Sequence, residues 1–100
     1  MKNFKVDQVD EIVHGRVRLG AMAYLSAQGS ADFTELRDAL DTAEGALSIH
    51  LRKLEAAGYV AIKKSFAGRK PRTTITLTAS GRSAYDAYLD TLQALLSVKF

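Results

Sequence analysis

A leucine repeat within residues 42–58 constrains the fold of this chain more than any other feature of the sequence. The leucines recur at i, i+4 and i+7, the spacing that places side chains on one face of a helix: Leu47, Leu51 and Leu54. Thr42, or Asp41 with Glu44 three residues later, supplies oxygen acceptors for the amides of a first helical turn. Gly58 is a natural left-handed stop. The sequence therefore predicts a helix with both ends encoded and one face buried.

The other face of this predicted helix, which spans residues 43–57, carries small, polar and basic side chains. They are Gly45, Ser48, Ile49, Arg52, Lys53 and Ala56. His50 lies at the edge of the leucine stripe, where we favour a hydrogen-bonded packing residue over a base reader or a pH sensor.

After Gly58 the period of the apolar residues changes from helical to alternating. The segments YVAIKKSF and TTITLT alternate with period 2 and are rich in β-branched residues, which predicts two strands. Between them lies AGRKPR, in which Gly68 favours a turn and Pro71 ends the pairing. Three cations lie on this predicted tip: Arg69, Lys70 and Arg72. Cations on a projecting hairpin suit contact with phosphates or a minor groove, although a turn kept soluble by charge is the alternative.

The first part of the chain predicts two helices with a short strand between them. Residues 9–28 show a broad helical apolar pattern that ends at Gly29, and Gly15 and Gly20 within it indicate tight packing against a neighbouring helix. Residues 30–33 are long enough only for a strand stub, and Thr34 opens a second, compact helix. The inner face of this second helix consists of Leu36, Ala39 and Leu40.

The Asp41-Thr42 step forms the predicted turn between this compact helix and the leucine-rich one. Two helices joined by such a turn make a helix-turn-helix if the first helix supports the second from behind. An ordinary helical hairpin is the alternative interpretation.

Residues 79–98 predict a last helix, capped by Thr78, whose apolar surface is wider than packing on one domain requires. Wide apolar faces in small domains are usually buried between subunits, so we expect 9–28 and 79–98 to be dimerisation elements. The residues expected at this interface are Val9, Ile12, Val13, Tyr88, Leu89, Leu92, Leu95 and Leu96. The alternative is that the last helix lies across the first within one chain.

Charge is unevenly distributed along the 100 residues. Residues 1–55 contain seven Lys and Arg against nine Asp and Glu, whereas residues 56–100 contain seven against two. No acid lies between Glu55 and Asp86. A long segment without acids favours a surface that faces a polyanion, and a solvated basic surface is the alternative.

Composition excludes several other classes of protein. With 47% hydrophobic residues the chain can form one domain, and without cysteine it has no disulfides, thiolate nucleophiles or cysteine-based zinc sites. The first residues contain no apolar run suited to export or to a membrane, which predicts a soluble cytoplasmic protein. His14 is interpreted as a polar helix residue because no second metal ligand is suggested nearby. Without a nucleophile pattern or a glycine-rich phosphate loop, we predict no enzyme activity, metal or cofactor.

The order helix, short strand, helix, turn, helix, two-stranded hairpin and helix resembles a winged helix-turn-helix, an α+β fold that is mainly α. Two motifs strengthen the resemblance: G-x-L-S-x-H-L-x-x-L-E-x-x-G-Y-V over residues 45–60, and F-x-G-R-x-P-R-T-x-x-x-L-T-x-x-G over residues 66–81. Over about residues 12–96 the chain resembles small stand-alone winged-helix transcriptional regulators of bacteria and archaea, relatives of the MarR and ArsR groups. This resemblance implies a homodimer on an operator of two half-sites, with recognition helix 43–57 in the major groove and wing 66–73 on the backbone or minor groove.

Nine residues are expected to contact double-stranded DNA: Thr34, Gly45, Ser48, Ile49, Arg52, Lys53, Arg69, Lys70 and Arg72. Arg52 is a candidate for guanine or phosphate, and Ile49 for a thymine methyl group. The free amides at the helix start, where Gly45 permits close approach, favour a phosphate. Ala46 stands where similar proteins often carry a polar residue, so Ser48, Ile49 and Arg52 bear more of the expected base reading.

The predicted function is a sequence-specific DNA-binding transcriptional regulator, and repression is the simplest mode for a chain without a fused domain. A winged-helix adaptor that binds an acidic protein partner is the alternative. A small-molecule effector between the first and last helices or at the dimer interface stays open, because no residue pattern identifies one. The operator and the regulated genes are not encoded in any pattern of this sequence.

Overall fold

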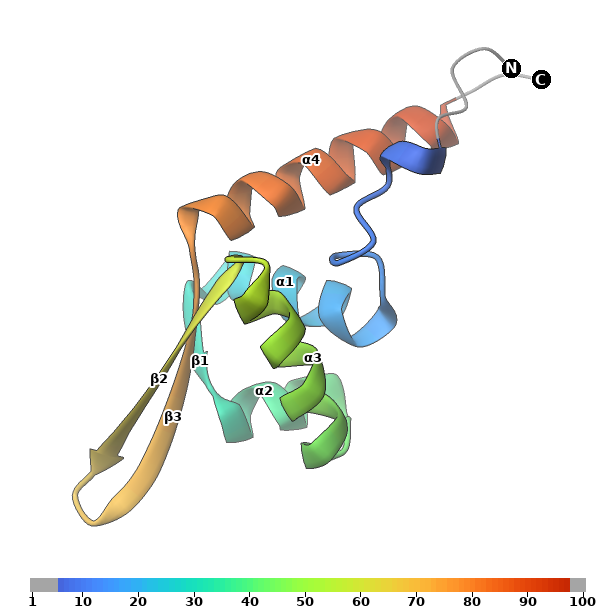
Figure 1. Ribbon diagram of the computed structural model, residues 1–100. Helices are drawn as coiled ribbons and strands as arrows, with labels where there is room; N and C mark the ends of the chain where they lie inside the picture. Colours follow the sequence, from blue (N-terminus) through green and yellow to red (C-terminus); the bar gives the residue numbers. More distant parts are fainter. Residues whose placement is uncertain (1–5, 98–100) are drawn as a thin grey trace.

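The computed structural model describes residues 6–97, which form a mainly helical fold with one small sheet (Figure 1). In chain order the elements are the 3-10 helix η1 (Val6–Gln8), α1 (Arg16–Gln28), β1 (Ser30–Asp32), α2 (Phe33–Leu40), α3 (Glu44–Ala56), β2 (Val60–Ala67), β3 (Lys70–Leu77) and α4 (Ala79–Leu96). The strands form an antiparallel sheet in the order β1-β3-β2. This arrangement confirms the predicted winged helix-turn-helix. No helix within residues 6–97 is long and apolar enough to cross a membrane.

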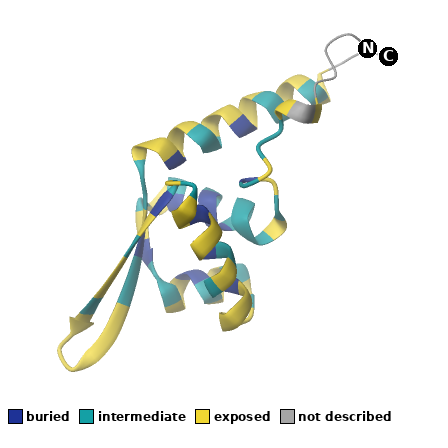
Figure 2. Cartoon of the chain, in the orientation of Figure 1, coloured by how far each residue is buried: buried dark blue, intermediate teal, exposed yellow. Residues whose placement is uncertain are grey.

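The core lies where α1, α2 and α3 meet the inner end of the sheet (Figure 2). Its largest fully buried side chains are Val13, Met22, Leu25, Leu36, Leu47, Leu54 and Ile75. The leucine stripe of α3 is buried as predicted, because Leu51 at 2% exposure joins Leu47 and Leu54. Burial of one such side chain away from water stabilises the folded state by about 1.5–3 kcal/mol. One face of α3 is therefore committed to the core, and the opposite face is left outside.

The first helix is shorter than predicted: residues 9–28 were expected to be helical, but α1 begins at Arg16. The cause is local, because Asp10 Oδ1 accepts the backbone N–H groups of Ile12 and Val13 at 2.8 and 3.1 Å, which closes a turn ahead of the helix. Gly15, predicted within the helix and packed on a neighbouring one, instead precedes α1 in an extended conformation, and a Cβ added to it would meet only the Arg18 side chain. The other end agrees with the prediction, since Gly29 has a φ of +85° and its N–H donates to the Leu25 carbonyl.

Polar contacts fasten this N-terminal segment, residues 9–15, to the helical body. The Tyr59 hydroxyl donates to Asp10 Oδ2 at 2.7 Å, and this bond raises the pKa of the hydroxyl above its usual value near 10. The Arg18 guanidinium donates to the Ile12 carbonyl through Nε at 2.6 Å. His14 Nδ1 lies 2.8 Å from the hydroxyl of Tyr88 on α4. The segment therefore packs as part of the domain instead of extending α1.

The turn between α2 and α3 differs from its prediction in how it is capped. Asp41 adopts a left-handed conformation with a φ of +48°. The residue before α3 is Ala43, and no side chain caps this helix, so the predicted caps from Thr42 or from Asp41 with Glu44 are wrong. Asp41 is instead the C-cap of α2, two residues before the Ala43 cap position of α3. The amides of the first turn of α3 thus have no side-chain acceptor.

Packing around α2 explains one predicted glycine and corrects one predicted face. A Cβ on Gly20 of α1 would lie 2.9 Å from Leu40 Cδ2, which confirms that the glycine permits close helix packing. Leu36 is buried and Leu40 is half-buried, but Ala39 is exposed and was wrongly placed on the inner face. With only eight residues, α2 turns a narrow stripe toward the core.

The wing strands are longer than the sequence indicated. Pairing of β2 with β3 continues to Ala67 opposite Lys70, so Pro71 pairs with Phe66 and does not end the ladder. A proline is tolerated because every second pair of an antiparallel ladder exchanges no hydrogen bonds. Gly68, with a φ of +67°, makes the turn as predicted. Because β1 pairs only with the inner part of β3, the outer half of the wing is a two-stranded ribbon that projects from the body (Figure 1).

The last helix, α4, starts against the turn that follows α3 and crosses above α1 (Figure 1). The Thr78 hydroxyl accepts the Gly81 N–H at 2.9 Å, which confirms the predicted cap. Gly81 is buried there, and an added Cβ would overlap the carbonyl oxygen of Tyr59. The helix ends at Leu96, and residue 98, where the predicted helix ended, lies outside the described residues.

Candidate nucleic-acid interface

The outer face of α3 is open to solvent, as its sequence predicted. Gly45, Arg52 and Lys53 are exposed, and Ile49 keeps 57% of its surface accessible. Ser48 is half-buried at the side of this face. No atom outside its own helix backbone and chain neighbours lies within 4 Å of a Cβ built on Gly45. The start of α3 is therefore free of obstruction as well as free of a side-chain cap.

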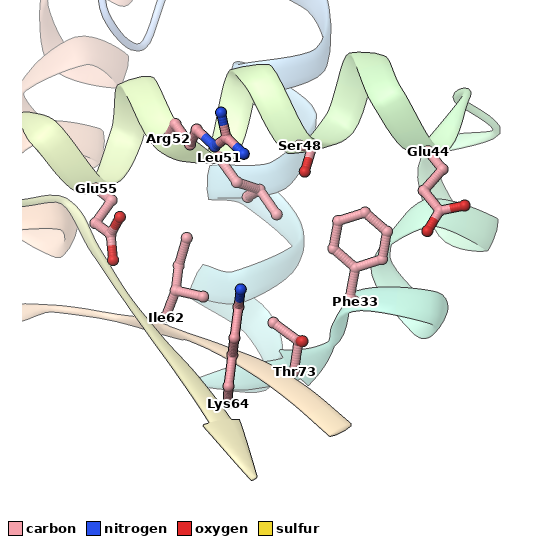
Figure 3. A pocket seen from close by; sticks show the side chains of 9 residues that line it. All are labelled: Phe33, Glu44, Ser48, Leu51, Arg52, Glu55, Ile62, Lys64 and Thr73. Carbon is pink, nitrogen blue, oxygen red and sulfur yellow. The ribbon is translucent and has the colours of Figure 1, made fainter. Parts of the chain in front are cut away.

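A groove of about 540 Å³ separates α3 from the wing (Figure 3). Its apolar floor is formed by Phe33, Leu51 and Ile62. Its polar walls are formed by Glu44, Ser48, Arg52 and Glu55 of α3 and by Lys64 and Thr73 of the wing. Ser48 and Arg52, predicted as DNA contacts, thus lie together on one wall.

Lys64 is a wall residue that the sequence-based list of contacts missed. It extends from β2 toward α3 (Figure 3). The sequence contained a signal for Lys64. Side chains of a strand alternate between its two faces, so Ile62 and Lys64 lie on the same face of β2, and Ile62 packs against the core. The predicted wing contacts all lie near the tip, whereas Lys64 is a cation on the inner part of the hairpin.

Two carboxylates, Glu44 and Glu55, also line this groove, and both are exposed. Neither was singled out as part of the site from the sequence. A carboxylate repels phosphate and accepts a hydrogen bond from a base amino group, so acids at opposite ends of α3 limit where a nucleic-acid backbone can pass. The positive part of the groove is its middle, between Arg52 and Lys64.

The predicted wing cations fall into two groups. Arg69 and Lys70 are exposed at the turn between β2 and β3, and Figure 2 shows the outer end of this ribbon as exposed. Arg72 instead donates from Nε to Asp32 Oδ1 at 2.9 Å, and this partner raises the pKa of the guanidinium. Arg72 is consequently shared between the wing and the start of α2.

Thr34 lies in a second concavity, of about 610 Å³, between the start of α2 and the outer part of the wing. It is exposed there and shares the concavity with Lys70 and Arg72. Asp32, Glu35 and Asp38 contribute acids to the same surface. The structure therefore places Thr34 near the wing cations, but in more acidic surroundings than the groove beside α3.

His50 is half-buried beside α1 and receives a hydrogen bond from Arg18, with Nη1 and the histidine Nδ1 2.9 Å apart. Because arginine stays protonated and only donates, Nδ1 is the acceptor and the neutral ring carries its proton on Nε2. Burial, followed by the charges of Arg18 and Lys53, lowers the pKa of His50 below 6.5. This agrees with the interpretation of His50 as a hydrogen-bonded packing residue. No group of three or more potential metal ligands comes together within residues 6–97.

Two of the expected interface residues are buried within a single chain. Val13 is 0% and Tyr88 is 3% exposed, so they hold the N-terminal segment and α4 in the core and offer no free interface area. Their apolar periodicity could not distinguish internal packing from contact between subunits. Among the others, Leu89 and Leu96 of α4 are exposed, and the remaining four are half-buried: Val9, Ile12, Leu92 and Leu95.

These elements define a winged helix-turn-helix: α2 and α3 follow one another across a short turn and share one core through Leu36 and Leu47, and the β2-β3 wing lies beside the open face of α3. Residues 17–96 match the winged helix DNA-binding domain family, and the chain belongs to this family.

Individual relatives agree with this assignment. An uncharacterised protein of Methanocaldococcus jannaschii is 34% identical over 79 residues, which cover 79% of this chain and 86% of that protein. A transcriptional regulator homologue from Pyrococcus horikoshii OT3 superposes with a TM-score of 0.87 at 33% identity, covering 96% of this chain and 95% of the other. A MarR-family regulator from Enterococcus faecalis V583 gives a TM-score of 0.73 at 32% identity, covering 93% and 83%. The chain is a small, MarR-like, DNA-binding transcriptional regulator.

Proposed function

We propose that this protein is a homodimeric, sequence-specific repressor that places α3 in the major groove of double-stranded DNA and its wing on the backbone or minor groove. The observation that carries this proposal is the set of exposed cations on α3 and the wing. Arg52 and Lys64 line the groove between these two elements, and the other exposed cations are Lys53 of α3 and Arg69 and Lys70 at the wing tip. Polyanion binding is the use that such a surface favours.

Base reading is assigned to the open face of α3. Arg52 is suited to guanine O6 and N7, Ile49 to a thymine methyl group, and Ser48 to a base edge or phosphate. Gly45 lets the start of α3 approach the duplex, where uncapped amides and the helix dipole favour a phosphate. The remaining contacts are backbone contacts: Thr34, Lys53, Lys64, Arg69, Lys70 and Arg72.

Dimer formation is assigned to α4 together with the N-terminal segment. Leu96 is 78% and Leu89 is 40% exposed, and the half-buried Leu92 and Leu95 lie on the same helix. Association of two copies would remove these side chains from water and would present two copies of α3 to an operator of two half-sites. Repression follows if occupancy of that operator blocks transcription.

Selection of binding sites from random duplex DNA tests the proposal most directly. We expect an enriched site with two-fold symmetry and two half-sites about one helical turn apart. On that site a dimer loses two contacts in Arg52→Ala, so at about 1–3 kcal/mol for each good base contact binding should weaken by about 30-fold or more. Lys63→Ala is the matched control, because Lys63 alternates away from the groove on the same strand as Lys64.

Light scattering on the free protein tests the dimer. We expect twice the chain mass at micromolar concentration, and Leu89→Lys should shift the protein to monomer and weaken operator binding together. A monomeric wild-type protein would contradict the subunit assignment. Equal binding of all duplex sequences would instead favour the adaptor alternative, in which the basic surface meets an acidic protein. We propose no particular small-molecule effector. A compound would count as one if its addition changed the affinity of the protein for the selected operator.

A further inference from the structure

The wing carries one large apolar side chain close to its tip. Phe66 of β2 is 72% exposed and stands directly opposite Pro71 of β3 in the strand register. A single exposed aromatic residue needs no explanation by itself. The position of Phe66 on the strand, relative to the groove beside α3, is what indicates a function.

Phe66 shares a strand face with the residues that line the groove beside α3. Strand side chains alternate, so Ile62, Lys64 and Phe66 point to the same side of β2. Ile62 and Lys64 line that groove (Figure 3), and Phe66 is the next residue of their row toward the wing tip and does not line the groove. The row changes along the strand from core packing, through a cation, to an exposed ring.

The surroundings of the ring determine which partner fits it. Arg69 and Lys70 lie at the adjoining turn, and the sequence from residue 56 to residue 85 contains no acid. The acids near the outer wing, Asp32, Glu35 and Asp38, lie beside β3 in a concavity that Phe66 does not line. A polyanion is therefore favoured over a neutral apolar surface. The polyanion must also offer apolar area, and the deoxyribose walls and base edges of a DNA minor groove do so.

The length of the outer wing is of the order that this partner requires. Ile62 and Phe66 are four positions apart on β2, a span of about 13 Å at the usual rise per strand residue. A major groove and the next minor groove along the duplex are about half a helical turn apart, about 17 Å. A duplex that seats α3 in a major groove would therefore bring the adjacent minor groove near the outer part of the wing.

We propose that Phe66 is a minor-groove contact that packs on deoxyribose and partly opens a base step, while Arg69 and Lys70 hold the flanking phosphates. Pro71 supports the ring from the opposite strand. This inference rests on the proposed DNA-binding function. It adds a source of specificity outside the bases that α3 touches, because pyrimidine–purine steps open more readily than others.

Fluorescence polarisation of one labelled operator duplex across a salt series tests the contact. Phe66→Ala should raise Kd about tenfold, as expected for partial loss of an aromatic contact, and leave the salt slope unchanged, because no phosphate contact is lost. Phe66→Leu should recover part of the affinity. Lys64→Ala is the contrast, since it should make the salt slope shallower. The thermal midpoint of Phe66→Ala checks folding, and exposure of the ring predicts little change.

Dimethyl sulfate probing locates the contact, because the reagent reports adenine N3 in the minor groove and guanine N7 in the major groove. Phe66→Ala should lose protection at adenines flanking each half-site and keep the protection at guanines. A Kd within about twofold of wild type, or a salt slope that changes as in Lys64→Ala, would overturn the inference and leave the proposed function intact. Failure of the wild-type protein to bind any duplex would overturn both.

Discussion

Two neighbouring lysines of β2 allow a strict test of the groove as a phosphate-binding surface. Lys64 lines the groove between α3 and the wing, whereas Lys63 alternates to the opposite side of the strand. Both are exposed, and both carry one charge at the same distance along the wing. Replacing either lysine by alanine changes the net charge equally. Any difference in DNA binding between the two variants therefore comes from the side of the strand on which the lysine lies, and not from the loss of charge.

The size of the expected difference follows from counterion release. Each phosphate contact contributes about 0.9 to the slope of log affinity against log salt, and a dimer loses two contacts in Lys64→Ala. The slope should therefore become shallower by about 1.8. Between about 50 and 200 mM salt, wild-type affinity should fall about twelvefold more than that of Lys64→Ala. Lys63→Ala should retain the wild-type slope.

Polarisation titrations at four or more salt concentrations within this range measure the three slopes on one duplex. Equal slopes for the two variants would refute the reasoning, because the groove would then have no privileged contact with the backbone. A shallower slope in Lys63→Ala alone would place the duplex on the other side of the wing.

Three further predictions concern stability and charge. Gly81→Ala should lower the free energy of unfolding by about 3 kcal/mol, because the new methyl group overlaps a backbone carbonyl oxygen. Gly45→Ala, whose methyl group enters open space, should raise the free energy of unfolding by about 0.5 kcal/mol. Urea denaturation compares the two variants, and equal effects would contradict the packing of α4. Asp32→Asn frees Arg72 for phosphate and should tighten DNA binding and steepen the salt slope in the same polarisation assay, and unchanged binding would show that this ion pair does not compete with DNA. Because the pKa of His50 is lowered in the folded protein, the unfolded chain binds a proton first as pH falls below about 6.5, and the free energy of unfolding should decrease there. This decrease should be smaller in His50→Gln. An identical pH dependence of the two proteins would exclude His50 as its source.

The sequence predicted the elements whose signals are local. The leucine stripe of α3, the glycine turns at Gly29, Gly58 and Gly68, and the Thr78 cap each depend on residues close together in the chain. The same locality explains two errors. The Asp10 turn that delays α1 replaces helix with side-chain hydrogen bonds that periodicity cannot detect, and pairing opposite Phe66 carries Pro71 into β3.

The candidate site was predicted where it is a helix face and missed where it depends on distant partners. Solvent exposure of Ile49 and Arg52 follows from their phase relative to the leucines. The ion pair of Arg72 with Asp32 joins residues forty positions apart, and the bond from Arg18 to His50 spans thirty-two. No pattern in one sequence encodes such pairings. Internal burial of Tyr88 was hidden for the same reason, since an apolar stripe looks alike whether the chain or a second copy covers it.

The two-stranded outer half of the wing has a consequence for how the protein tolerates changes in length. Beyond the end of β1, no third strand within the described residues pairs with the ribbon, so its reach past the Arg72–Asp32 ion pair is set by residue number at about 3.3 Å per residue. Matched insertions of two residues in β2 and β3 would lengthen it and keep every side chain on its side. A single inserted residue before Lys64 would turn both Lys64 and Phe66 outward, because strand faces alternate. Natural or engineered variants of this hairpin should therefore differ in length by even steps.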